Sequence, residues 1–248
     1  MHKKRNFLSS DIYRYGINYD CIKISFMLEW IRIFHYVSAR NKNSAEVIMD
    51  KKEIAAFFDS YASSWDADMI KEQWKIDSIL DVAQINEGTA VLDVACGTGV
   101  LIPDYIVRKV GRCVAVDISH NMIDIAKSKF WGHENLEFIC ADAETFDFGE
   151  KFDSIVIYNA FPHFADRRLL FENLSAHLED NGRITVAHSM SRENLLKHHS
   201  GKAEKISTVL PEADELAEIM LPYYEVDVKI STDEIYVVSG KKITAPSF

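Results

Sequence analysis

The chain has 248 residues, of which 48% are hydrophobic and 27% are charged, and its formal net charge is −10 at pH 7. This length and apolar content suffice for a full hydrophobic core, and the charged fraction is ordinary for a water-soluble protein. Residues 1–48 carry a net charge of +4 and the remainder −14; because so acidic a body without a basic run repels phosphate groups, we expect no nucleic-acid partner.

Residues 1–48 form an N-terminal extension that the sequence leaves open to interpretation. The stretch Ile22–Val37 is apolar, but it has only 16 residues and includes both acidic and basic side chains. It is therefore too short and too charged to span a membrane, and it lacks the continuous apolar core and cleavage site of a secretory signal. One interpretation is an interfacial helix that touches a membrane or a partner. The other is a poorly ordered extension upstream of a mistaken start, with the true start at Met49.

Residues 49–85 carry apolar side chains at helical spacing. The side chains that make this pattern are Ile54, Phe57, Phe58, Tyr61, Trp65, Ile70, Trp74, Ile76, Ile79 and Leu80. Aromatic residues at such spacing usually pack in a core, so the pattern by itself predicts helices and no function. We expect this segment to precede a main domain that occupies residues 86–248.

A buried strand followed by a glycine turn is predicted at residues 91–99. Apolar side chains at 91, 92 and 94 make the short run of a strand that is buried on both faces. Gly97 and Gly99 have no Cβ, so backbone N–H groups of the turn can approach a ligand at the start of a helix over about 100–110. The dinucleotide fingerprint G-x-G-x-x-G does not fit, because Ile102 stands in place of its third glycine.

Two further strands are predicted to end beside carboxylates. Cys113–Asp117 is predicted as a buried strand whose last residue is an acid, and Ser119 is a suitable N-cap for a helix over about 121–130. The strand Leu136–Cys140 leads directly to Asp142. Because ligands in open α/β sheets bind at the carboxyl ends of the strands, we expect both acids to lie at one rim with the glycine turn.

The rest of the chain continues the alternation of strands and helices. The predicted elements are a strand over Phe152–Tyr158, a helix over Asp166–His177, a strand over Arg183–Ala187, a short helix to about Met220, and strands over Tyr224–Ile230 and Ile235–Ser239. Gly182 is expected to stop the first of these helices, and Pro211 to open the second. The predicted fold class is α/β, with a doubly wound, mostly parallel sheet.

The spacing Asp93-x-Ala95-x-Gly97-x-Gly99 resembles the nucleotide loop of the class I S-adenosylmethionine-dependent methyltransferases. Ala95 stands where that family usually has its first glycine, a mild departure of one methyl group. The resemblance covers about residues 55–242 and implies a Rossmann-like fold of seven strands, the last of them antiparallel. It also implies that Asp117 binds both ribose hydroxyls, and that the segment around Asp142 recognises adenine.

The string from Phe57 to Asp66 resembles the helical lid of ubiquinone/menaquinone-type and related small-molecule methyltransferases, which makes residues 49–85 a lid over the cofactor. These resemblances imply that S-adenosylmethionine is held by Tyr61, Trp65, Asp93, Ala95, Cys96, Gly97, Thr98, Gly99, Asp117, Ile118, Asp142, Ala143 and Asn159.

Histidines follow the predicted fourth and fifth strands, at the rim that faces the methyl group. We expect His163 and His188 to line the acceptor pocket, with one of them acting as the general base. His198 and His199 lie in a long connection, residues 189–210, where they are either solvated or bind substrate or a metal.

The four cysteines form neither a Cys-x-x-Cys pair nor an evident disulfide framework, which favours thiols in a reducing cytoplasm. We therefore expect a cytoplasmic enzyme that transfers the methyl group of S-adenosylmethionine to a small-molecule acceptor by in-line displacement. One alternative is a non-catalytic S-adenosylmethionine-binding sensor or partner subunit. A nicotinamide oxidoreductase is another, against which Ile102 argues.

Overall fold

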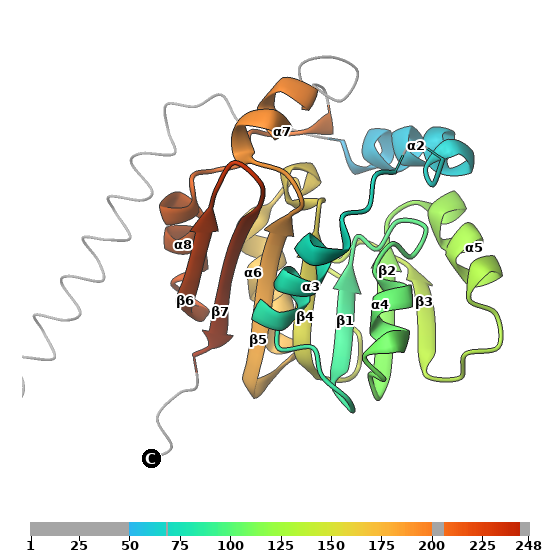
Figure 1. The fold of residues 1–248 in the computed structure, drawn as a ribbon, viewed down its shortest axis with the longest axis horizontal. Coiled ribbons are helices and arrows are strands. Elements are labelled where there is room, and N and C mark those ends of the chain that lie inside the picture. Colours follow the sequence, from blue (N-terminus) through green and yellow to red (C-terminus); the bar gives the residue numbers. More distant parts are fainter. Residues whose placement is uncertain (1–49, 68, 200–205, 244–248) are drawn as a thin grey trace, which may run out of the picture. The chain divides into compact units, whose positions relative to one another are not determined.

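The computed structural model describes residues 50–67, 69–199 and 206–243, so the expectations for residues 1–48 lie outside the described part. Figure 1 shows a sheet of seven strands with the order β3-β2-β1-β4-β5-β7-β6. The strands are β1 (Ala90–Val94), β2 (Arg112–Asp117), β3 (Leu136–Cys140), β4 (Phe152–Tyr158), β5 (Leu178–His188), β6 (Tyr224–Ser231) and β7 (Tyr236–Lys242). Strands β1 to β5 are parallel, and β7 is antiparallel to both β5 and β6. The predicted α/β fold with an antiparallel last strand is confirmed.

Helices cover both faces of this sheet. The described helices are α2 (Lys51–Tyr61), η1 (Ala62–Ser64), α3 (Gln73–Val82), α4 (Ile102–Val107), α5 (His120–Lys129), η2 (Phe161–His163), α6 (Arg167–Ala176), α7 (Arg192–His199) and α8 (Ala213–Met220). Apolar side chains of α3, α4 and α5 pack on one face, and those of α6 and α8 on the other. Strands β1, β2 and β4 are therefore buried on both sides, which explains their nearly continuous apolar sequences.

The sequence signals for helix starts are confirmed where a side chain caps the helix. Ser119 precedes α5, and its Oγ accepts a hydrogen bond from the N–H of Met122. Asp166 does the same for α6 with the N–H groups of Arg168 and Leu169. Each cap satisfies N–H groups that the first helical turn leaves without a partner.

Two residues that were predicted to mark helix boundaries do not mark them. Helix α6 ends at Ala176, and Gly182 lies inside β5, where the register with β4 shifts. A Cβ at Gly182 would lie 2.8 Å from Leu178 Cδ1, so this glycine answers a close approach within the strand and is not a helix stop. Pro211 lies before the N-cap Glu212, which forms a capping box with Glu215 and so begins α8.

The segment predicted as one continuing helical pattern divides in two. Helix α2 lies at the carboxyl edge of the parallel strands, whereas α3 packs on a face of the sheet (Figure 1). Between them, residues 65–67 and 69–72 are not helical, and Ile70 is 86% exposed. The apolar pattern wrongly predicted one continuous helical face, because its side chains do not all lie on the same surface. Ile76 is in the core, whereas Ile70 faces solvent.

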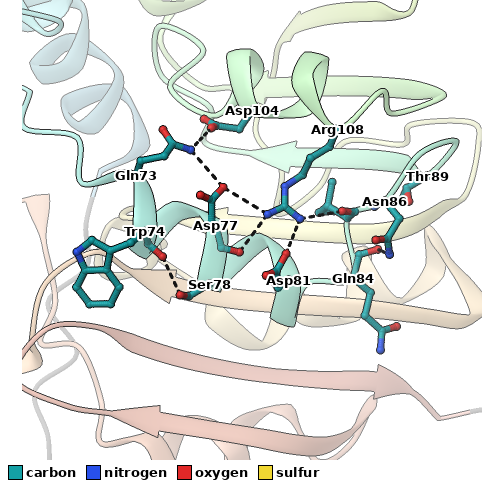
Figure 2. A network of polar contacts seen from close by, with 11 residues as sticks. Gln73, Trp74, Asp77, Ser78, Asp81, Gln84, Asn86, Thr89, Asp104 and Arg108 are labelled. Atoms are coloured by element: carbon teal, nitrogen blue, oxygen red, sulfur yellow. Dashed lines mark hydrogen bonds and ion pairs between the residues drawn. The ribbon is translucent and has the colours of Figure 1, made fainter.

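Polar contacts fix α3 to α4 (Figure 2). Arg108 donates to Asp81 Oδ1 at 2.7 Å and to the carbonyl oxygens of Asp77 and Ile85, while Gln73 donates to Asp104 at 2.6 Å. Asp81 is 70% exposed, so its ion pair adds little to the free energy of folding. The contacts instead fix the position of α3 and of its first residue, Gln73. They thereby also fix the end of the segment that leads to α3 from the carboxyl edge of the sheet.

A buried lysine joins α3 to the opposite end of the chain. The side chain of Lys75 is 7% exposed, and its Nζ lies 2.5 Å from Glu72 Oε2 and 2.9 Å from Glu234 Oε2. It also donates to the carbonyl of Ser189 at 3.3 Å. Lys75 therefore links α3, the loop between β6 and β7, and the residue that follows β5.

Gly99 tests how much the glycine turn depends on packing. Its φ is +83°, and an added Cβ would lie 2.6 Å from Phe130 Cε2, in a ring that stacks on Phe138. We expect Gly99→Ala to lower the free energy of unfolding by about 3 kcal/mol, from backbone strain and overpacking together. Gly132→Ala is the matched control, because its φ is +90° and a Cβ would meet nothing within 4 Å. In urea unfolding, the free energy of unfolding of Gly132→Ala should be about 1–2 kcal/mol higher than that of Gly99→Ala. Equal losses in the two variants would contradict the packing role of Gly99.

Candidate functional site

A cavity of about 780 Å³ opens at the carboxyl ends of β1, β2 and β4, beneath α2. This volume is in the range of small-molecule sites in proteins. Among the residues predicted from the sequence, its lining includes Tyr61, Trp65, Asp93, Ala95, Cys96, Gly97, Asp117, Ile118, Asp142, Ala143, Asn159 and His163. The structure does not bring Thr98, Gly99 or His188 to this lining.

Asp117 ends β2 with its carboxylate fixed from two sides. Oδ2 accepts the N–H of Gly97, and Oδ1 accepts the N–H of Ser119, both at 2.9 Å. Burial raises the pKa of Asp117, while the two backbone N–H groups act in the opposite direction. A carboxylate can accept about four hydrogen bonds, so two acceptor positions remain for donors of a ligand such as the hydroxyls of a ribose.

Asp93 is a buried acid that faces the same cavity. It is 2% exposed, and Oδ2 has no hydrogen-bond partner among the described residues. Burial, with a smaller contribution from the charge of Asp117, raises the pKa of Asp93 to about 8. A buried carboxyl of this kind fits a cationic ligand, because a positive charge nearby would favour its ionised form. The ammonium and sulfonium groups of S-adenosylmethionine are such cations.

The pKa of Asp93 predicts a pH dependence of stability. The folded-state pKa lies above the unfolded value of 3.8, so the folded protein binds the extra proton between about pH 4 and 8. The contribution of Asp93 to the free energy of unfolding is therefore largest below about pH 4. It is lost as the pH rises towards 8. We expect urea unfolding of the ligand-free protein to show a loss of about 2 kcal/mol between pH 6 and 8 that Asp93→Asn largely removes. Asp233→Asn, at an exposed site, should keep the wild-type slope, and an unchanged slope in Asp93→Asn would refute the assignment.

Ala95, Gly97 and Thr98, in the turn after β1, differ in backbone conformation and in contacts. Ala95 has φ +57°, in the left-handed region, so alanine adds backbone strain of about 1 kcal/mol as well as a methyl group. The structure thereby corrects the expectation of a mild departure. Gly97 also has a positive φ and lies at the cavity, where its N–H holds Asp117. Thr98 is fully buried and donates to Asp66 Oδ1 at 2.5 Å, which ties the turn to the chain after η1.

Asp142 is held by a lysine that the sequence did not single out. Nζ of Lys51, in the first turn of α2, lies 2.5 Å from Asp142 Oδ2 and 2.6 Å from Glu144 Oε2. The Glu144 side chain is only 2% exposed, so Lys51 supplies the positive charge that a buried carboxylate requires. Lys51 and Lys52 are adjacent and identical in type, and no pattern in the sequence distinguishes them.

Removal of Lys51 tests this attachment. We expect Lys51→Met to lower the free energy of unfolding by about 1–2 kcal/mol, because it leaves Glu144 buried without its cation; partial exposure of the lysine keeps the effect below that of a fully buried pair. Lys52→Met, at an exposed position of the same helix, should change it by less than about 0.5 kcal/mol. Equal effects of the two variants in urea unfolding would contradict the role of Lys51.

Residues of α2 and η1, together with Trp65, line one side of the cavity. Phe58 makes edge-to-face contacts with Trp65, at 5.7 Å between ring centroids, and with His163 at 5.0 Å. On the other side of α2, Asp59 accepts hydrogen bonds from Ser119 Oγ at 2.6 Å and from the N–H of Asn121. Helix α2 is thus fixed to the start of α5 as well as to the segment after β3.

The two histidines predicted to share the acceptor pocket lie in different environments. His163 is in η2, beyond the end of β4, and its Nδ1 lies 3.0 Å from the carbonyl oxygen of Ile206. The hydroxyl of Ser207 lies 3.1 Å from the same nitrogen. His188 is still within β5, so its side chain packs against the sheet, where it is 0% exposed beside Tyr236.

The surroundings of the remaining candidate residues, Asn159, Cys96, His198 and His199, are as follows. Asn159 has φ +54° and exchanges hydrogen bonds with Ser189, at 2.9 and 3.0 Å. Burial raises the pKa of the Cys96 thiol well above its usual value, which disfavours a reactive thiolate. The connection that carries His198 and His199 contains α7, and their side chains lie outside the described part. Within the described residues, no three His, Cys, Asp or Glu side chains are placed to hold a metal.

Comparisons with known proteins find similarity to methyltransferases. Residues 91–182 match the family described as methyltransferase domain. The chain is 29% identical over 143 residues to a malonyl-[acyl-carrier protein] O-methyltransferase of Acetivibrio thermocellus, covering 56% of this chain and 50% of that protein. It is 30% identical over 155 residues to the ubiquinone/menaquinone biosynthesis C-methyltransferase of Hahella chejuensis, covering 57% and 62%. The chain thus spans about half to three fifths of these relatives.

Solved structures show the same fold. Magnesium protoporphyrin IX methyltransferase from Synechocystis, with bound S-adenosylhomocysteine, has a TM-score of 0.59 at 19% identity over 78% of this chain and all of that one. The N-methyltransferase NodS from Bradyrhizobium japonicum, also with S-adenosylhomocysteine, has a TM-score of 0.61 at 12% identity over 76% and 97%.

Proposed function

We propose that this chain is a class I S-adenosylmethionine-dependent methyltransferase and that it transfers a methyl group to a small-molecule acceptor bound under a lid formed by α2, η1 and Trp65. The observation that carries the proposal is the single cavity shared by Asp117, the N–H of Gly97, Asp93, Asp142 and His163. When bound, S-adenosylmethionine supplies a methyl group activated by a positively charged sulfur.

The polar side of the cavity is proposed to hold the cofactor. Asp117 accepts hydrogen bonds from the two ribose hydroxyls, with its carboxylate already oriented by two backbone N–H groups. Asp142 and the backbone of Ala143 contact the adenine ring. Asp93 balances the positive charge of the cofactor, and the lid residues Tyr61 and Trp65 exclude water from the site.

The acceptor side is proposed to use His163 as the general base. Its Nδ1 is oriented by the carbonyl of Ile206, and its imidazole is proposed to take the proton from the acceptor. Orientation of the base and of the acceptor is the main contribution that a protein makes to a displacement of this kind.

Two measurements on the full chain test the proposal. Calorimetry should show stoichiometric binding of S-adenosylhomocysteine, and incubation with methyl-labelled S-adenosylmethionine and a metabolite pool should yield a labelled acceptor. Absence of binding at millimolar concentration, or a preference for NAD, would overturn the whole proposal. Binding without transfer to any pool would instead indicate a sensor or partner subunit.

The location of the protein belongs to the same proposal. Cys96, Cys113 and Cys140 form no disulfide within the described residues, in keeping with the reducing cytoplasm expected from the sequence. The described helices include none with the length and apolar character that crossing a membrane requires.

A further inference from the structure

The turn formed by residues 65–67, directly after η1, lies between part of the cavity and solvent. Trp65 belongs to the lining of the cavity and is partly buried, whereas the next two residues are exposed. A Cβ added at Gly97 would lie 3.7 Å from Nε1 of Trp65, so the indole lies beside the residue whose N–H holds Asp117. A ligand that is bound at Asp117 is therefore close to this turn.

Asp66 fixes the turn to two neighbouring elements. Its Oδ1 accepts a hydrogen bond from Oγ1 of Thr98 at 2.5 Å, and its Oδ2 lies 2.7 Å from Nζ of Lys129. Thr98 is fully buried in the turn after β1, and Lys129 is the last residue of α5. Burial raises the pKa of Asp66, but the hydrogen bonds from Lys129 and Thr98 outweigh this effect and hold the pKa below its usual value. Asp66 is therefore a charged acceptor for both partners at neutral pH.

The contacts of Asp66 join protein atoms only, so they require no ligand to form. We propose, resting on the proposed function, that the cofactor enters and leaves the cavity past residues 65–67, and that Asp66 is the positioning residue that keeps this passage closed. Asp66 acts through its neighbour Trp65, whose indole has to move away from Gly97 before a ligand can pass. Loss of the contacts of Asp66 makes this movement easier.

The exposure of these side chains separates local opening of the turn from unfolding of the protein. The side chain of Asp66 is 47% exposed and that of Lys129 is 35% exposed. An ion pair this exposed adds little to the free energy of folding. The same contacts weigh more in a local opening, in which few other contacts are broken. Loss of Asp66 is therefore expected to change the rate of ligand exchange, while the midpoint of urea unfolding stays close to that of the wild type.

The rates of binding distinguish control of the passage from a direct role in holding the ligand. Because the turn has to open for both entry and exit, easier opening raises kon and koff by the same factor and leaves Kd unchanged. Loss of a contact that stabilises the bound ligand instead raises koff alone and weakens binding. The value of kon therefore decides between the two roles.

Stopped-flow tryptophan fluorescence on the full chain measures both rates for S-adenosylhomocysteine, and calorimetry measures Kd. In Asp66→Ala we expect kon and koff each to rise about tenfold, as for loss of one partly exposed, charged hydrogen bond, with Kd within about threefold of the wild type. Asp214→Ala is the matched control and should keep both rates, because Asp214 is also exposed and bound to a lysine, Lys229, but lies outside the cavity lining. A kon of Asp66→Ala within about twofold of the wild type would overturn the inference. Failure of S-adenosylhomocysteine to bind to the wild type would overturn the proposed function instead.

A second variant tests whether Asp66 acts through Thr98. Thr98→Val keeps the shape of the buried side chain and removes the hydroxyl that donates to Asp66. We expect Thr98→Val to raise kon as well, and the double variant with Asp66→Ala to raise it no further than Asp66→Ala alone. Factors that multiply in the double variant would show independent effects and would contradict the shared contact. If Thr98→Val does not fold, the kon of Asp66→Ala decides alone.

Discussion

Asp117→Asn is expected to weaken the binding of S-adenosylhomocysteine roughly 100-fold, the amount that loss of a charged hydrogen-bond acceptor typically causes. The asparagine side chain keeps the shape but has one oxygen in place of two. Because both carboxylate oxygens already accept backbone N–H groups, the amide NH₂ would face one of these donors. The variant therefore loses an acceptor for the ribose and a support of the glycine turn together.

Calorimetry at constant pH measures this effect, and Asp124→Asn is the control, because it removes an exposed acid from the helix that follows Asp117. We expect the control to bind S-adenosylhomocysteine as the wild type does. Affinity of Asp117→Asn within threefold of the wild type would show that this carboxylate does not hold the ribose.

His163→Gln is expected to lower kcat by about 10²–10⁴-fold, the usual contribution of a positioned general base. Glutamine retains a donor that can reach the carbonyl of Ile206, so the contact at the position of Nδ1 can be kept while the proton acceptor is lost. The affinity for S-adenosylhomocysteine should stay within about threefold, since His163 is proposed to face the acceptor.

The rate is measured with the acceptor found by the labelled-donor screen, and His133→Gln is the control at an exposed site. In His163→Gln we also expect the remaining rate to rise with pH, because ionisation of the acceptor in solution replaces the missing base. A kcat equal to that of the wild type would exclude His163 as the base. Equal loss in His133→Gln would indicate a general effect on the protein.

The strands of the sheet could be predicted because each has its own local signal. The strands Leu136–Cys140 and Phe152–Tyr158 begin and end where the apolar runs and their flanking residues indicate. Ser119 and Asp166 were recognisable as caps, since their side chains act on residues two or three positions away. Local chemistry of this kind is contained in the sequence itself.

Features that depend on contacts between distant segments were not predictable. Lys51 binds acids 91 and 93 positions later in the chain, and nothing near Lys51 indicates them. Gly182 was mistaken for a helix stop, because a Cβ there would lie 3.0 Å from the carbonyl oxygen of Asp153 on the neighbouring strand β4, a contact that only the sheet brings about. His188 was placed at the rim from its position near a strand end, but β5 extends through it, so the side chain is buried in the sheet.

The contacts of Lys75 give the cavity a connection to the far end of the chain. Glu234, on the loop between β6 and β7, is bound to Lys75, which in turn donates to Ser189, and Ser189 is bound to Asn159 in the cavity lining. Mutations that tune catalysis at a distance are therefore expected in this hairpin. A search for variants with altered acceptor range should include this loop, where a change in sequence leaves the cavity wall itself intact.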